Sequence, residues 1–139
     1  FNKSILNFYV NKKFDFLNYD DALNKLDIDR IINENQRRIN YYIKNIDELY
    51  NASKNIGAQA IFINQLMSDG NNNEKLFILN YSLIKHCVRK NYKCIDLAKK
   101  LKGKKDFWWD GIHTTIKGSE EISNLIFDDL IALISLRKI

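Results

Sequence analysis

The chain has 139 residues, of which 45% are hydrophobic and 28% are charged, and its net charge is +5 at neutral pH. This length provides one domain with a core of its own and excludes two, and the composition excludes a wholly disordered chain. No apolar run approaches the roughly 20 residues that a membrane-spanning helix needs. The densest basic clusters, RKNYK and KKLKGKK, do not alternate with aromatic residues, so we expect no nucleic-acid partner.

The first predicted elements are a long helix and a short strand. Apolar residues at helical spacing predict an amphipathic helix over 28–56. Gly57 follows this helix and tolerates the left-handed conformation of a helix C-cap. The run AIFIN (60–64) is continuous and apolar, which is typical of a strand buried on both faces.

The remaining elements repeat this order. Apolar spacing predicts a helix over 76–88, YKCIDL (92–97) predicts a second buried strand, and a final helix is predicted over 115–136. A strand–helix–strand unit of this length implies parallel strands. Because two strands alone do not make a stable sheet, either SILNFYV (4–10) adds a third strand or further strands lie outside residues 1–139. We favour the second alternative.

The sequence has two cysteines and two histidines. A disulfide between Cys87 and Cys94 is geometrically possible, but we expect two buried, reduced thiols, and the compartment stays open. His86 lies between charged neighbours in a predicted helix, and we expect it at the surface or half-buried.

The second histidine, His113, follows Asp110 by three residues in the stretch FWWDGIHTTIKGSEEIS (107–123). This stretch leads from the carboxyl end of the second strand, where open parallel sheets bind ligands. There an aspartate can hold one imidazole nitrogen and leave the other to take a proton. Two ligands are too few for zinc, so we expect no metal site and no cofactor.

The segment DGIHTTIKG resembles the last block of the SGNH (GDSL-type) hydrolases, which reads Asp-x-x-His followed by a glycine at the final helix. The segments 45–65 and 80–101 are similar to the helices and strands that precede this block, so the resemblance covers about 41–133. It implies an α/β fold, a three-layer α/β/α sandwich with a flavodoxin-like parallel sheet, here lacking the first strands. Residues 1–139 would form a single domain, the C-terminal portion of such a hydrolase.

The resemblance also implies an activity, the hydrolysis of esters through a Ser-His-Asp triad. His113 would be the general base and Asp110 would orient its imidazole. The expected substrates are small-molecule or carbohydrate esters, above all carbohydrate O-acetyl or other short acyl esters. Asn64 and Gln65, at the end of the first strand, are expected to line the substrate pocket, although polar residues there, like Asp96, commonly only cap the next element.

The nucleophile has no counterpart in the chain. Neither the Gly-Asp-Ser block nor the Gly-x-Asn-Asp block of the family occurs, and Thr114 stands where many members have proline. Ser68 follows a strand end but lacks a glycine-rich turn before it. Because the family's nucleophile follows the first strand and the chain begins at Phe1 rather than Met, we expect the serine upstream of Phe1 or on another chain, and no esterase activity from this chain alone. The alternative is a catalytically inactive relative used for binding or scaffolding; oligomeric state and localisation stay open.

Overall fold

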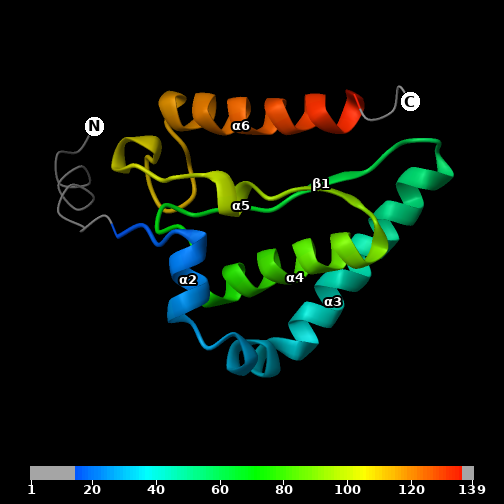
Figure 1. The fold of residues 1–139 in the computed structure, drawn as a ribbon, viewed down its shortest axis with the longest axis horizontal. Helices are drawn as coiled ribbons and strands as arrows, with labels where there is room; N and C mark the ends of the chain where they lie inside the picture. The colour runs from blue at the N-terminus through cyan, green and yellow to red at the C-terminus, as the bar shows by residue number, and fades with distance from the viewer. Residues whose placement is uncertain (1–14, 136–139) are drawn as a thin grey trace.

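A computed structural model describes residues 15–135. Its elements follow in the order α2 (Tyr19–Lys25), α3 (Ile28–Asn55), β1 (Ile61–Ile63), α4 (Glu74–Lys90), β2 (Lys93–Ile95), α5 (Leu97–Lys100), the 3-10 turn η1 (Lys105–Phe107) and α6 (Ile116–Ser135). Figure 1 shows α6 along one side of the strands and α3 and α4 on the other. The predicted sequence of long helices and strands is confirmed, whereas the segment 4–10 lies outside the described residues. No helix within 15–135 is long and apolar enough to cross a membrane.

The prediction of a three-layer α/β/α sandwich with a multistranded flavodoxin-like sheet is wrong. Helices make up 65% of the described residues and strands 9%, and over 15–135 the sheet consists of β1 and β2 alone. These strands pair in parallel, as predicted, with Ile61 opposite Lys93 and Ile63 opposite Ile95. Each is three residues long. The apolar runs predicted buried strands, but with one neighbour each they form a short ribbon, and Ile63 is exposed.

The long helix α3 is built as its apolar spacing predicts. The Asp27 carboxylate caps its first turn by accepting the Arg30 backbone N–H at 3.0 Å. Along its length, Ile39 packs with Ile78 of α4, and Ile46 packs with Leu83. This continuous apolar contact makes α3 and α4 one hydrophobic unit beneath the strands.

A disulfide joins Cys87 at the end of α4 to Cys94 in β2, which corrects the prediction of reduced thiols. Asn91 ends α4 in the left-handed conformation, with φ of 55°. The chain therefore turns back along the helix, and the two cysteine Cα atoms lie 6.3 Å apart, within the range that a disulfide spans. The separation of seven residues between Cys87 and Cys94 gave no sign that the chain reverses direction at Asn91.

The carboxyl ends of the two strands are fastened together by Asn64, which is 2% exposed. Its Nδ2 donates to Asp96 Oδ1 at 2.7 Å, and its Oδ1 accepts the Ala98 backbone N–H at 2.8 Å. Asp96 also caps α5 by accepting the Lys99 backbone N–H, so the capping role foreseen for it is confirmed. One buried side chain thus connects β1, β2 and α5.

The helix α6 docks through a close backbone approach at Gly118. A Cβ added there would lie 2.2 Å from the Phe107 carbonyl oxygen, so a larger residue must push α6 away from η1. Thr115 reinforces the junction, because its Oγ1 accepts the Gly118 N–H at 3.1 Å and donates to the Asp106 carbonyl at 2.7 Å. The loop between η1 and α6 is therefore held at both ends.

We predict that Gly118→Ala lowers the free energy of unfolding by about 2–3 kcal/mol, because backbone atoms must yield to the new methyl group. Gly57→Ala is the matched control. Gly57 has φ of 74° but nothing within 4 Å of an added Cβ, so only backbone strain of about 1 kcal/mol is expected. Urea unfolding measures both. A Gly118→Ala protein as stable as the parent would contradict the packing of α6 on η1.

Candidate active site

The side chains of Asp110 and His113 face each other in the loop between η1 and α6. The imidazole Nδ1 lies 2.7 Å from Asp110 Oδ2. The other carboxylate oxygen, Oδ1, accepts the backbone N–H groups of Ile112 and His113, each at 2.8 Å. Both oxygens of one carboxylate are thus engaged, and the loop closes around it as an Asx-type turn.

These contacts determine the protonation of the pair. The backbone N–H of Ile112, the imidazole of His113 and the backbone N–H of His113 together lower the pKa of Asp110 to about 2. Asp110 is therefore ionised at neutral pH and acts only as an acceptor, so Nδ1 of His113 carries the shared proton. In the neutral imidazole, Nε2 is then an unprotonated acceptor with no hydrogen-bond partner among residues 15–135.

The loop lies at the carboxyl end of the sheet. Ser68, in the segment that follows β1, donates its backbone N–H to the Gly111 carbonyl at 2.9 Å. Within the loop, the Trp109 N–H donates to the His113 carbonyl at 2.8 Å. The His113 side chain is 70% exposed. The imidazole is consequently fixed by its own loop and open to an incoming reactant.

The two residues expected to line a substrate pocket differ in their surroundings. The Asn64 amide is buried and engaged in the junction between the strand ends, which is a structural role. Gln65 is exposed. Its backbone is held by Asn80, whose Oδ1 accepts the Gln65 N–H and whose Nδ2 donates to the Gln65 carbonyl. A substrate contact through the Gln65 side chain stays a prediction.

A serine nucleophile is not in place among the described residues. Ser68 contacts the loop through its backbone, and no serine hydroxyl within 15–135 hydrogen-bonds to His113. The Ser119 hydroxyl is engaged with Thr114 Oγ1 at 2.7 Å. The same part of the chain holds no group of three or more His, Cys, Asp or Glu side chains that could bind a metal ion.

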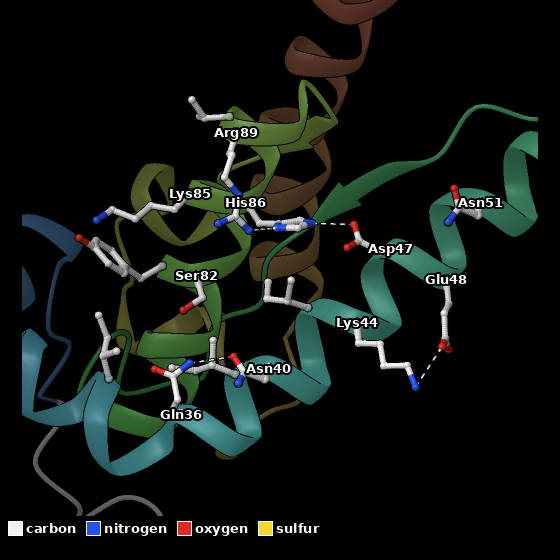
Figure 2. A pocket seen from close by; sticks show the side chains of 15 residues that line it. Gln36, Asn40, Lys44, Asp47, Glu48, Asn51, Ser82, Lys85, His86 and Arg89 are labelled. Atoms are coloured by element: carbon white, nitrogen blue, oxygen red, sulfur yellow. Dashed lines mark hydrogen bonds and ion pairs between the residues drawn. The ribbon is translucent and has the colours of Figure 1, made fainter.

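A second aspartate–histidine pair, shown in Figure 2, was missed by sequence reasoning. His86 is 3% exposed, which corrects the expectation of a surface or half-buried residue. Its Nε2 lies 2.7 Å from Asp47 Oδ1 on α3, and its Nδ1 lies 2.8 Å from the Arg89 guanidinium. Asp47 also accepts the Tyr92 hydroxyl. Asp47 lies 39 residues before His86 and 45 residues before Tyr92. No local sequence pattern reveals contacts over such separations.

The two histidines are therefore different chemically. Because the guanidinium can only donate, Nδ1 of His86 accepts and its Nε2–H donates to Asp47. Both ring nitrogens are occupied and the ring is buried, so His86 serves the packing of α3 against α4 at the edge of a groove of about 900 Å³. His113 keeps one nitrogen accessible, and it is the candidate for proton transfer.

Comparisons with models of protein families, with curated proteins and with solved structures find no match to this chain.

We predict that the Asp110 carboxyl titrates near pH 2, measured from its side-chain ¹³C resonance. In His113→Ala its pKa rises but stays below the usual value of about 3.9, because the backbone N–H of Ile112 still donates. Since the folded-state pKa is depressed, the stability that Asp110 contributes is present above about pH 4 and is lost as pH falls toward 2. An Asp110 pKa near 3.9 in the parent protein would contradict the hydrogen bonds described.

Proposed function

We propose that Asp110 and His113 are the acid and base members of a Ser-His-Asp triad in an ester hydrolase of the SGNH type. The proposed substrates are carbohydrate O-acetyl or other short acyl esters. The observation that carries the proposal is the arrangement of His113, whose Nδ1 is held by an ionised carboxylate while Nε2 is open at the carboxyl end of the parallel strands. The nucleophilic serine is proposed to lie outside this chain, because residues 1–139 contain no Gly-Asp-Ser block; within 15–135, no serine hydrogen-bonds to His113.

In the proposed reaction, Nε2 of His113 takes the proton of the serine hydroxyl as the serine oxygen bonds to the acyl carbon. The imidazolium then gives this proton to the departing alcohol as the ester bond breaks. A water molecule enters, loses a proton to Nε2 and attacks the acyl-serine. The serine oxygen recovers the proton, and the carboxylic acid leaves. Asp110 keeps its negative charge throughout and stabilises each imidazolium.

The test uses the protein with any residues that its gene encodes before Phe1, assayed with p-nitrophenyl acetate and with an O-acetylated oligosaccharide. We predict that His113→Ala lowers kcat by about 10³-fold or more, since the proton acceptor is lost. Asp110→Asn should lower kcat by about 10⁴-fold, because the wrong imidazole tautomer is favoured. Asp29→Asn, an exposed carboxylate on α3, is the matched control and should leave turnover unchanged.

Residues 1–139 alone should show no turnover. Turnover by this chain that depends on His113 would overturn the placement of the serine. Turnover by the longer protein that survives His113→Ala would overturn the triad itself. A longer protein with no activity on either ester would instead support a catalytically inactive binding or scaffolding role.

A further inference from the structure

A second hollow is lined by the two residues that flank the Asp110–His113 loop, Trp109 and Thr114, and by the first turns of α6. It is a groove of about 660 Å³, called here the α6 groove, between the Asp110–His113 loop and the first turns of α6. The loop contributes Trp109 and Thr114 to its lining, and α6 contributes Ile116, Ser119, Glu120, Ser123 and Asn124. The groove is distinct from the one at His86, with which it shares no residue.

The position of Trp109 is fixed relative to the candidate base. Its backbone N–H bonds to the His113 carbonyl at 2.8 Å, and its neighbour Trp108 forms an isolated β-bridge with Thr114. The Trp109 side chain is nevertheless 70% exposed. An indole that is held by its backbone and left mostly uncovered offers a flat apolar face at low entropic cost to a ligand.

Four of the α6 residues that line the groove are polar and follow the helical repeat. Ser119 and Ser123 lie one helical turn apart, and so do Glu120 and Asn124, so all four side chains occupy neighbouring positions on one face of α6. Together they present hydroxyl, carboxylate and amide groups, which both donate and accept hydrogen bonds. The Glu120 carboxylate repels a phosphate, which disfavours a nucleotide, and four polar residues disfavour an acyl chain.

A sugar ring has the complementary chemistry. One face of a pyranose presents C–H groups, which carry partial positive charge and suit the negative face of an indole. Its rim presents hydroxyl groups, which donate to carboxylate and amide oxygens and accept from amide and hydroxyl donors. A few convergent polar groups beside an apolar surface are the usual composition of a small-ligand site.

We propose that the α6 groove binds a saccharide, stacked on Trp109 and hydrogen-bonded by Glu120 and Asn124. This inference rests on the proposed function and deepens it, because it makes a sugar the alcohol part of the ester and places it beside the loop that carries His113. Binding itself requires no catalysis, so the groove can be tested apart from the triad.

The experiment is an NMR titration of residues 1–139, in the parent and His113→Ala forms, with chitotriose, xylotriose and maltotriose, and with octanoate as an acyl probe. At least one trisaccharide should shift the Trp109 indole N–H and the backbone amides of 119–124, in both forms alike. Trp109→Ala should weaken that binding by about tenfold or more, as followed by the same amides. Phe127→Ala removes an aromatic side chain that is 61% exposed on the same helix outside the groove, and it should bind as the parent does.

Failure of every trisaccharide to shift these resonances would overturn the inference, as would shifts caused by octanoate alone. Equal affinity in Trp109→Ala and the parent would also overturn it. Esterase assays of the longer protein decide the triad separately, since saccharide binding by His113→Ala is expected whether or not the triad is active.

Discussion

The carboxylate of Asp110 organises the loop that holds the candidate site. One oxygen accepts hydrogen bonds from two backbone N–H groups and so determines the shape of the loop. The other oxygen is hydrogen-bonded to the imidazole of His113. The same contacts that close the loop keep the carboxylate ionised, because each favours the charged form. Loop geometry and imidazole orientation are therefore consequences of a single side chain.

The remainder of the fold places this loop at the carboxyl end of the two strands. The buried amide of Asn64 aligns the carboxyl ends of β1 and β2, and the segment after β1 meets the loop through the bond from Ser68 to Gly111. On the far side, the absence of a side chain at Gly118 lets α6 approach Phe107 closely. The helices α3 and α4, with the disulfide from Cys87 to Cys94, give the strands a rigid support.

The sequence predicted those features that depend on residues close together in the chain. The helices α3, α4 and α6 and the left-handed Gly57 after α3 depend on residues close together in the sequence. The contact of Asp110 with His113, three residues later in the same loop, does so as well. The burial of His86 and the disulfide could not be read from the sequence, because they depend on Asp47 far along the chain and on the reversal at Asn91. The fold class was wrong because the family resemblance implied strands that residues 15–135 do not form.

The most direct test of the central claim is the tautomer of His113, read from its imidazole ¹⁵N resonances at neutral pH. We expect a proton on Nδ1, shared with Asp110, and an unprotonated Nε2, the form that can accept a proton from a hydroxyl. His86 provides an internal reference, since its bonds to Asp47 and Arg89 place the proton on Nε2. A proton on Nε2 of neutral His113 would contradict the account, because that nitrogen could not then act as the base.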